Sequence, residues 1–333
     1  MILFALQNMA DKIVRIGTRE SPLAVWQAQQ VQRLLTAQNV SSELVYIKSE
    51  GDTDLVTPLY TLGVQGIFTK ALDTALLNNR IDIAVHSMKD VPVQLAEGVK
   101  QAAVLKRGSC KDVFVYKDKS TLEKIGYING QWAMNNGQWL TIHSSSLTIA
   151  TSSVRRIAQW LNRYPNTTIE NLRGNVNTRL RKLKESAWHG AIFAAAGLER
   201  IGLRPATAID LDWMLPAPAQ GAIMVVCREG DEAIFKTCMN FNDDATALCV
   251  KIERDFLKVL SGGCSTPISA LVEVKNYDVA FKGNILSIDG KVKVEIAKTI
   301  FFNKANQLGK IAGEEILSKG GDKIIEQIRN AAR

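Results

Sequence analysis

The sequence predicts an α/β protein with two α/β parts followed by a smaller α+β part. Short apolar runs at 13–18, 44–48 and 81–86 alternate with helical patterns, which is typical of a mostly parallel sheet covered by helices. The same alternation starts again near residue 112. The pattern changes at residues 244–260, where one amphipathic helix precedes three strand-like runs.

The first predicted helix begins at Ser21-Pro22, because serine is a preferred N-cap and proline fits the first helical turn. Its apolar stripe consists of Leu23, Trp26, Val31, Leu34 and Leu35. A loop at 63–66 (GVQG) then leads to a second helix. The apolar face of that helix carries Phe68, Leu72, Ala75 and Leu76.

The second α/β part is predicted to contain strands at 113–116, 148–151 and 190–195 and helices at about 153–163 and 175–186. Residues 126–147 show no regular period, so we expect a long loop or a hairpin insertion there. An apolar strand at 222–227 follows.

The last part begins with the helix at 244–260, which Ser261-Gly262-Gly263 ends. Strands are expected at 269–274, 278–288 and 291–301, with Asp289-Gly290 as the turn between the last two. A terminal helix is expected from about 304. The sequence shows no internal repeat at a fixed period.

Composition points to a globular protein of several domains. The chain has 333 residues, of which 46% are hydrophobic and 22% charged. No run approaches the roughly 20 apolar residues that span a bilayer. The start, MILFALQNMADK, lacks a basic leader and a cleavage pattern, so we expect no secretory signal, with Met9 as an alternative natural start.

The cysteines favour reduced thiols in the cytoplasm. There are 5 of them, and no two have C-x-x-C spacing, so a disulfide framework or a zinc site is not expected. We expect no metal. The net charge of +8 attracts anions in general, including nucleic acids, membranes and small polycarboxylates, without choosing among them.

Three predicted strand-to-helix turns present hydroxyl groups and cations. These are Arg19-Glu20-Ser21, the TSSVRR segment at 151–156, and Leu172-Arg173-Gly174-Asn175 with Arg179 one turn later. Helix N-termini bind anions, and arginine binds a carboxylate with two parallel N–H groups. Each turn alone is better explained by a helix cap and solvated arginines. All three together favour a ligand with several negative groups.

The segment HSMKDVP at 86–92 follows a predicted strand. There, Lys89 could bind a carboxylate, and Asp90 could stabilise a cation or move a proton. The alternative is a surface Lys–Asp pair beside a turn stiffened by proline. His86 lies on the apolar strand and is equally explained as a core histidine with its hydrogen bonds satisfied.

Cys264 lies in the sequence GGCSTP at 262–267, where glycines permit close approach of a ligand. A loop cysteine is more accessible than Cys227 or Cys249, so a reactive or modified thiol is plausible, with a buried apolar filler as the alternative. No Walker loop, G-x-G-x-x-G fingerprint or nucleophile elbow is present. Only the net charge favours nucleic-acid binding.

Eight ordered motifs together resemble the hydroxymethylbilane synthase (porphobilinogen deaminase) family. The matching strings are RIGTRESPLAVWQAQ (15–29), EGDTD (50–54), HSMKDVPV (86–93), TSSVRR (151–156), LRGNVNTRL (172–180), AAAGLERIG (194–202), PAPAQGA (216–222) and LSGGCSTPI (260–268). The resemblance runs from about Val14 to Val272 and is weaker thereafter.

The resemblance implies that Cys264 carries a dipyrromethane cofactor through a thioether bond. Four porphobilinogen molecules would be added in turn with loss of ammonia, and water would release hydroxymethylbilane for haem biosynthesis. The expected catalytic residues are Asp90, Lys89 and Arg19. The expected cofactor contacts are Ser87, Lys89, Asp90, Thr151, Ser153, Arg155, Arg156 and Arg179, and the expected substrate contacts are Arg19, Ser21, Gln27, Arg173, Arg179 and Arg200.

The sequence departs from the family pattern at three places. The loop that often reads G-G-K-G contains Gln65 instead of lysine, so a cation expected near the active-site mouth is absent. Ala150 replaces the glycine that often precedes T-S-S. The insertion at 126–147 is longer than usual.

We therefore predict two lobes like those of a periplasmic-type binding protein and a small α+β domain. The expected domains are 12–107 with 222–229, then 112–215, then 230–333 with Cys264. We expect the active cleft between the first two domains, Cys264 reaching in from the third, and hinge motion as the product lengthens. We also expect a monomer with porphobilinogen as its partner, and neither nucleic acid nor membrane.

Two other functions compete with this one. A non-enzymatic anion-binding protein of the same two-lobe shape would need neither Cys264 nor Asp90. A nucleic-acid-binding regulator would show an affinity that falls steeply with salt. Intact mass separates the enzyme from both, because only the enzyme would be heavier than its sequence by one dipyrrole.

Overall fold

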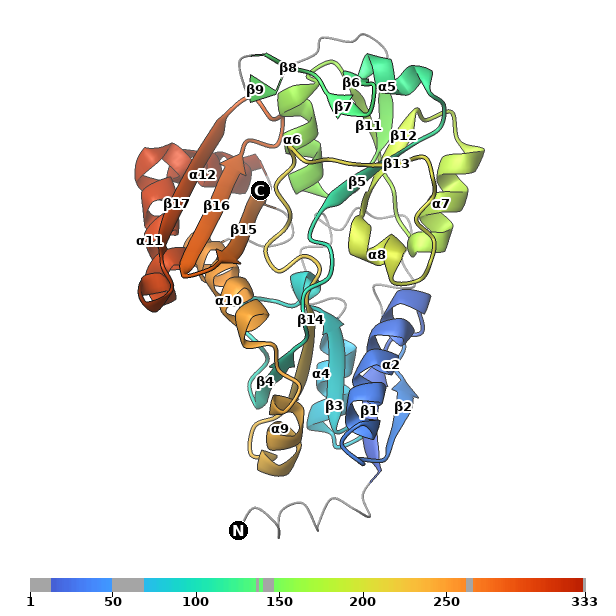
Figure 1. Cartoon of the computed structure of the whole chain (residues 1–333), viewed down its shortest axis with the longest axis vertical. Helices are drawn as coiled ribbons and strands as arrows, with labels where there is room; N and C mark the ends of the chain where they lie inside the picture. Colours follow the sequence, from blue (N-terminus) through green and yellow to red (C-terminus); the bar gives the residue numbers. More distant parts are fainter. Residues whose placement is uncertain (1–12, 50–68, 136–137, 140–146, 262–265, 332–333) are drawn as a thin grey trace. The chain divides into compact units, whose positions relative to one another are not determined.

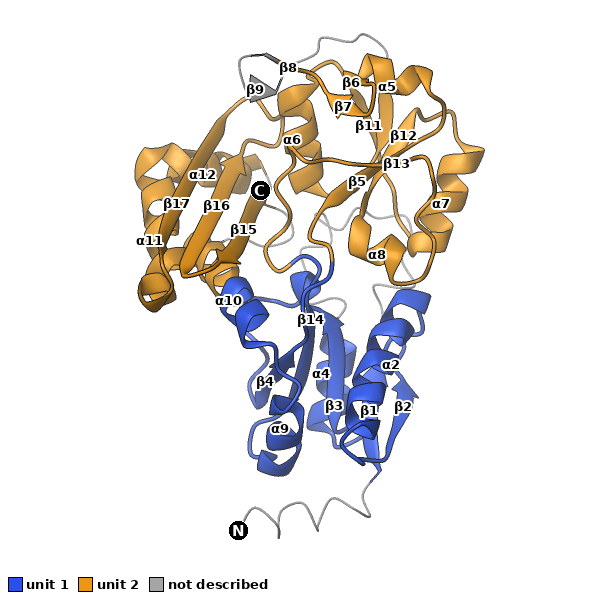
Figure 2. Ribbon diagram, in the orientation of Figure 1, with its two compact units in different colours: residues 1–55, 64–108, 220–250 blue, residues 56–63, 109–219, 251–333 orange. Residues whose placement is uncertain are grey.

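A computed structural model describes residues 13–49, 69–135, 138–139, 147–261 and 266–331 (Figure 1). They fall into two compact units (Figure 2). Unit 1 takes its described residues from 1–55, 64–108 and 220–250, and unit 2 from 56–63, 109–219 and 251–333. The chain therefore leaves unit 1 after its first α/β part and later returns to it.

Unit 1 contains a five-stranded sheet with helices beside it. The strand order is β2 (Ser42–Tyr46), β1 (Val14–Thr18), β3 (Ile83–Ser87), β14 (Ile223–Arg228) and β4 (Val99–Val104). Strand β1 is parallel to β2 and β3, whereas β14 is antiparallel to β3 and β4. The helices are α2 (Pro22–Thr36), α4 (Lys70–Leu77) and α9 (Glu232–Met239).

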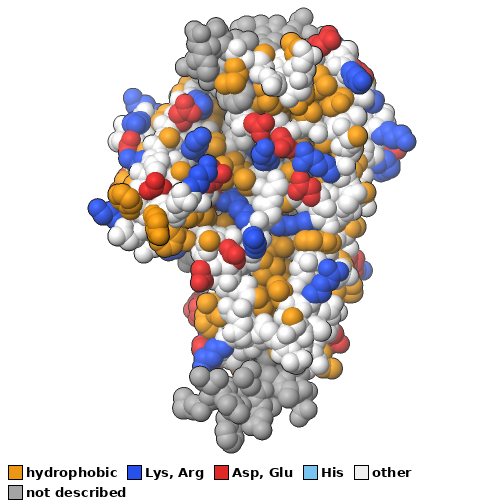
Figure 3. Space-filling model, viewed as in Figure 1, with side chains coloured by type: hydrophobic (Ala, Val, Ile, Leu, Met, Phe, Trp, Pro, Cys, Tyr) orange, Lys and Arg blue, Asp and Glu red, His pale blue; other side chains and the backbone are white. Residues whose placement is uncertain are grey.

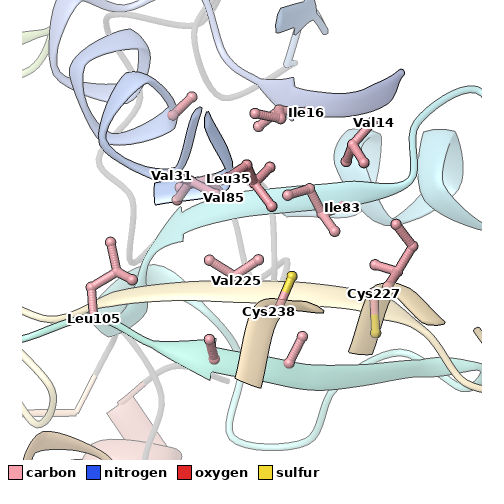
Figure 4. Packing of buried hydrophobic residues seen from close by; sticks show 14 of the residues in the cluster. Val14, Ile16, Val31, Leu35, Ile83, Val85, Leu105, Val225, Cys227 and Cys238 are labelled. Carbon is pink, nitrogen blue, oxygen red and sulfur yellow. The ribbon is translucent and has the colours of Figure 1, made fainter. Parts of the chain in front are cut away.

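Helix α2 begins as the sequence predicts. The Ser21 hydroxyl accepts a hydrogen bond from the Ala24 N–H at 3.4 Å, and Pro22 stands in the first turn. Val31 and Leu35 are buried in the core of the unit, with Trp26 and Leu34 packed against it. Figure 4 shows this core, where α2 side chains meet those of β1, β3 and β14.

Unit 2 contains a second five-stranded sheet with the same pattern of directions. Its order is β11 (Thr168–Glu170), β10 (Thr148–Ala150), β12 (Gly190–Ala194), β5 (Asp112–Tyr116) and β13 (Ala208–Asp210). Here β10 is parallel to β11 and β12, and β5 is antiparallel to β12 and β13. The helices are α5 (Ser120–Lys124), α6 (Val154–Arg163), α7 (Val176–Glu185) and α8 (Ala195–Glu199).

Within the predicted insertion at 126–147, the described residues form short hairpins. Strand β6 (Tyr127–Ile128) pairs with β7 (Gln131–Trp132), and β8 (Met134–Asn135) pairs with β9 (Gln138–Trp139). The buried Trp132 indole donates to the Asp210 carbonyl at 3.0 Å and stacks on the Arg163 guanidinium. The hydrogen bond therefore attaches the first hairpin to β13 of the second sheet, and the cation–π contact attaches it to the Arg163 side chain, whose residue ends the helix that begins at Val154.

The rest of unit 2 is a three-stranded antiparallel sheet with helices. Its strands are β15 (Ile268–Lys275), β16 (Asp278–Leu286) and β17 (Lys293–Phe301), in that order. Helix α10 (Asp244–Val259) precedes the sheet, and its residues up to Val250 belong to unit 1. Helices α11 (Leu308–Ile316) and α12 (Asp322–Ala331) follow the sheet. The rings of Phe256 and Phe281 lie 5.1 Å apart and join α10 to β16.

The structure confirms the α/β class and the predicted order of the long elements. Each large sheet is mostly parallel, as predicted, but contains one antiparallel strand that the periodicity did not indicate. Strands β4, β11 and β13 and helices α8 and α9 were not predicted. The residues from 251 onward form one compact unit with the second sheet, and the division into three domains stays a prediction.

The hairpin between β16 and β17 confirms the predicted Asp289-Gly290 turn and packs against α6. Gly290 has φ +72°, and its carbonyl accepts a hydrogen bond from the Asn162 side chain at 2.7 Å. A Cβ added at Gly290 would lie 2.5 Å from the Ala158 carbonyl oxygen. Only glycine therefore fits this position without displacing the helix backbone.

We expect Gly290→Ala to lower the free energy of unfolding by about 2–4 kcal/mol, from the left-handed backbone and the backbone clash together. Gly202→Ala is the matched control, because Gly202 has φ +66° and no atom within 4 Å of an added Cβ. It should lose only about 1–2 kcal/mol. Urea denaturation measures both, and equal losses would show that the α6 contact is unimportant.

Candidate active-site residues

The first candidate group in unit 1 follows β1. Arg19 is partly exposed, and Ser21 serves as the N-cap of α2. Gln27, expected to contact substrate, is 2% exposed, and its amide faces the hydroxyl of Ser87 on β3. The Gln27 Nε2 to Ser87 Oγ distance is 2.9 Å, so this amide connects α2 to the end of β3.

The second group in unit 1 is the turn after β3. Met88 is 1% exposed, and its N–H donates to the Ala222 carbonyl at 3.0 Å, which fixes the start of a single 3₁₀ turn over Met88–Asp90. Lys89 and Asp90 are partly exposed on this turn. Within the described part of the chain, no side-chain hydrogen bond or ion pair engages the Asp90 carboxylate. A rigid backbone thus presents an available carboxylate next to a lysine in the sequence.

His86 lies just before this turn and is 6% exposed. Burial, together with the nearby positive charge of Arg19, lowers the pKa of His86 to about 4. The imidazole is therefore neutral at pH 7, which agrees with the interpretation as a core histidine.

The N-terminus of α6 in unit 2 carries Thr151 and Ser153. Thr151 is 2% exposed, and its hydroxyl accepts from the Ser153 N–H at 3.3 Å. Ser153 occupies the N-cap position, yet its side chain makes no capping hydrogen bond. The Ser153 hydroxyl is therefore not used to cap α6. This helix has 10 residues, and its aligned peptide dipoles place a partial positive charge at its N-terminus.

Arg155 and Arg156 point into unit 2 and share one carboxylate. Asp112 on β5 is fully buried, with its Oδ2 atom 2.7 Å from Arg155 Nη2 and its Oδ1 atom 2.8 Å from Arg156 Nη2. The Arg155 Nη1 group also donates to the Leu215 carbonyl, and Arg156 Nη1 donates to that of Ile192. Burial lowers the pKa of Arg155, with Asp112 opposing the shift. One carboxylate facing two guanidinium groups leaves an excess of positive charge.

The LRGN segment forms the turn into α7. Asn175 caps this helix by accepting from the Thr178 N–H at 3.0 Å, and Gly174 has φ +110°. Arg179 is partly exposed, and its Nε donates to the Gly174 carbonyl at 2.7 Å, so the helix side chain is bound to its own turn. Arg173 is 3% exposed.

The last candidate arginine, Arg200, follows α8. Burial lowers the pKa of Arg200 to about 10.

Two predicted residues lie outside the described part of the chain, namely Cys264 and Gln65. The structure also shows a buried partner of two candidate site residues that the sequence did not indicate, Asp112 beside Arg155 and Arg156. The sequence did contain a sign of this pairing, namely an aspartate at the start of an apolar strand. A carboxylate that is buried at such a position needs an ion pair or hydrogen bonds. Asp82 has the same signal in the run IDIAVH and is also fully buried.

Among the described residues, no group of His, Cys, Asp and Glu side chains could hold a metal ion, and no helix is long and apolar enough to cross a membrane. On the face that Figure 3 shows, Lys and Arg side chains lie among Asp and Glu side chains.

The low pKa of His86 predicts a pH-dependent stability. Because the folded pKa is about 4 and the unfolded value is 6.5, unfolding takes up a proton between these limits. The stability from neutral His86 is complete above about pH 6.5 and falls as the pH drops toward about 4, by about 1.4 kcal/mol per pH unit. Urea denaturation at about pH 7 and pH 5 should show this slope in the wild type and a weaker one in His86→Gln. An unchanged slope in the variant would assign it to other groups.

Comparison with protein families matches almost the whole chain. A family model described as porphobilinogen deaminase, dipyromethane cofactor binding domain, matches residues 14–236. A second model, porphobilinogen deaminase, C-terminal domain, matches residues 247–318.

Individual relatives agree with these models. The chloroplastic porphobilinogen deaminase of Oryza sativa subsp. japonica is 39% identical over 330 residues, covering 95% of this chain and 87% of that protein. The porphobilinogen deaminase of Desulforamulus reducens is 37% identical over 320 residues, covering 95% of this chain and 98% of that protein.

Solved structures similar to the chain include the periplasmic VFT2 domain of Bordetella pertussis BvgS, with a TM-score of 0.41, 12% identity, and coverage of 74% of this chain and 95% of that one. Another is the substrate binding protein of an amino acid ABC transporter, with a TM-score of 0.36, 10% identity, and coverage of 69% and 91%. The family assignment follows from the two family models and the sequence relatives. The chain belongs to the porphobilinogen deaminase family, the transferases of tetrapyrrole biosynthesis that carry a dipyrromethane cofactor and act as hydroxymethylbilane synthases.

Proposed function

We propose that this chain performs hydroxymethylbilane synthesis with Cys264 as the attachment residue and Asp90 as the catalytic carboxylate. The observation that carries the proposal is the turn over Met88–Asp90, in which a buried methionine fixes the backbone and leaves Asp90 partly exposed. A catalytic acid needs a fixed position and an open face, and this turn provides both.

The donors at the start of α6 in unit 2 suit an acidic cofactor. The α6 N-terminus has a cap hydroxyl that is not used for capping, and the buried Arg155 Nε–H has no hydrogen-bond partner among the described residues. When bound, dipyrromethane supplies a free pyrrole position for porphobilinogen, together with acetate and propionate side chains. Carboxylates of this kind are matched by N–H groups and guanidinium groups.

Asp90 would stabilise positive charge that develops on pyrrole groups and would hold or move a proton at its carboxylate oxygens. Because the negative charge is already in position before the reaction begins, it lowers the activation barrier without any reorganisation of the protein. Lys89, next to it, would bind a substrate or cofactor carboxylate. Arg19, which lies close enough to His86 to affect its pKa, would do the same at the end of β1.

The arginines of unit 2 would divide into two roles. Arg173, Arg179 and Arg200 would contact acetate and propionate groups directly. Arg155 and Arg156 would serve the cofactor beside Thr151 and Ser153, Arg155 with its Nε–H and both with the positive charge that the single Asp112 carboxylate leaves uncompensated. Both roles place excess positive charge around a ligand that gains carboxylates with every addition.

Gln27 and Ser87 would position the catalytic turn. Their hydrogen bond joins α2 to the residue immediately before Met88. Ser21 would contribute its hydroxyl and the α2 N-terminus to carboxylate binding. Gln65 is given no catalytic role, because a neutral amide cannot replace the charge of lysine.

The chain would work as a monomer in the cytoplasm. Among the described residues, no disulfide joins Cys110, Cys227, Cys238 or Cys249, which supports a reducing compartment. Sedimentation of the purified protein tests the oligomeric state.

Intact mass spectrometry tests the attachment residue. We expect the purified wild type to be heavier than its sequence by one dipyrromethane, and Cys264→Ser to match its sequence, because serine cannot form the thioether. Cys110→Ser is the control, because Cys110 is a partly exposed cysteine outside any disulfide and its replacement should leave the adduct in place. A wild type without the adduct, even after incubation with porphobilinogen, would refute the proposed function.

Steady-state kinetics test Asp90. Asp90→Asn keeps the size of the side chain and removes its charge, so we expect the adduct to remain while kcat falls by about 10²–10⁴. Glu97→Gln is the control, because Glu97 is an exposed carboxylate seven residues later in the same unit. A kcat for Asp90→Asn within about twofold of the wild type would remove Asp90 from the mechanism.

A further inference from the structure

A buried glutamine on α6 has no part in the proposed chemistry. Gln159 is 6% exposed and lies one helical turn after Arg155, so the two side chains share one face of α6. Both residues belong to unit 2. A buried amide needs hydrogen-bond partners, and those of Gln159 lie outside its own helix.

The amide of Gln159 binds both backbone groups of Leu215. Its Oε1 atom accepts from the Leu215 N–H at 2.9 Å, and its Nε2 group donates to the Leu215 carbonyl at 3.0 Å. Leu215 lies between β13, which ends at Asp210, and β14, which begins at Ile223, and belongs to no helix or strand. Because no sheet or helix bonds its backbone there, the side chain of Gln159 supplies the partners.

The Leu215 carbonyl also accepts a hydrogen bond from Arg155. Arg155 Nη1 lies 2.6 Å from this oxygen, and Arg155 Nη2 lies 2.7 Å from Asp112 Oδ2. A guanidinium group is planar, so contacts at two of its nitrogens set the direction of the third. That third nitrogen, Nε, is buried and has no hydrogen-bond partner among the described residues. The Leu215 carbonyl and Asp112 therefore decide where the Nε–H of Arg155 points.

Gln159 fixes one of these two anchors of Arg155. The Asp112 anchor is a side chain at the first position of β5, whereas the Leu215 anchor is a backbone carbonyl outside regular structure. The Leu215 anchor therefore depends on Gln159 for its position. Gln159 is itself attached to β15, because its Nε2 group donates to the Ser269 hydroxyl at 3.0 Å.

We propose that Gln159 is a positioning residue for the Arg155 guanidinium group, acting through the backbone of Leu215. The inference rests on the proposed function, in which the Arg155 Nε–H serves a carboxylate of the cofactor. Without the amide of Gln159, the Leu215 carbonyl can move, and the guanidinium group can turn about its remaining contact with Asp112. An Nε–H that turns away no longer holds a cofactor carboxylate in place.

Gln159→Met tests this role, because methionine is an unbranched, flexible side chain of similar length that lacks the amide. Ser269→Ala is the matched control, since it removes the hydrogen bond between Gln159 and β15 and leaves both bonds to Leu215. Each substitution removes contacts of the same buried amide. Only Gln159→Met should change the orientation of Arg155.

Hydrogen exchange of the holoenzyme and kinetics per mole of bound cofactor are the two readouts. In Gln159→Met we expect the Leu215 amide to exchange at least about tenfold faster than in the wild type, because its acceptor is gone. We expect kcat to fall roughly 10- to 100-fold with KM within about twofold, since displacement by about 1 Å costs up to 10²-fold and Arg155 is assigned to the cofactor rather than to porphobilinogen. Ser269→Ala should keep kcat within about twofold of the wild type.

Gln159→Glu serves as a second variant. It keeps an acceptor for the Leu215 N–H and loses the donor to the Leu215 carbonyl, so its kcat per bound cofactor should also fall. If Gln159→Met does not fold, this variant decides the question. A folded Gln159→Met that lacks the adduct, while Ser269→Ala carries it, also supports the inference.

Wild-type turnover per bound cofactor in either folded Gln159 variant overturns the inference. An unchanged exchange rate of the Leu215 amide in Gln159→Met, or an equal loss of kcat in Ser269→Ala, does the same. A wild type that lacks the adduct refutes the proposed function instead.

Discussion

A single buried carboxylate shared by two arginines joins β5 to the start of α6 in unit 2. Asp112 approaches Arg155 and Arg156 at 2.7 and 2.8 Å, and all three side chains are removed from water. Removing the carboxylate would leave two uncompensated cations, and losses of about 3–5 kcal/mol are typical when one partner of a buried pair is deleted. The start of α6, with Thr151 and Ser153, therefore depends on β5 for its position.

Unit 1 uses the same arrangement at a different point of its sheet. The fully buried Asp82 lies 3.0 Å from Arg15 on β1 and 3.3 Å from Arg228 on β14. Each large sheet thus has a central carboxylate shared by two arginines, together with the same order of strand directions. The likeness between the sheets lies in topology and charge pairing, since the sequence shows no repeat at a fixed period. The charge arrangement has different structural roles, because Asp112 fixes a helix start whereas Asp82 joins strands.

Local patterns predicted the elements, and distant partners decided the side chains. Ser21-Pro22 and Asn175 start helices through bonds to residues three positions later, so the sequence alone indicated these ends. Arg155 and Arg156 lie in a turn that predicts ligand contact, but the turn gave no sign of the buried carboxylate that both guanidinium groups face, 44 residues from Arg156. Gln27 faces Ser87, 60 residues away. Such pairings follow from how the sheets assemble, which periodicity does not encode. The short strands β11 and β13, three residues each, carry too little pattern to predict.

The place of β14 in unit 1 has a consequence for biosynthesis. This strand lies between β3 and β4, yet residues 112–210, which form the whole second sheet, are made before it. On the ribosome, the second sheet can therefore be completed while the first still lacks an inner strand and β4 has no neighbour to pair with. Nascent chains shorter than about 230 residues would expose unpaired apolar edges of the first sheet, where chaperones bind during translation.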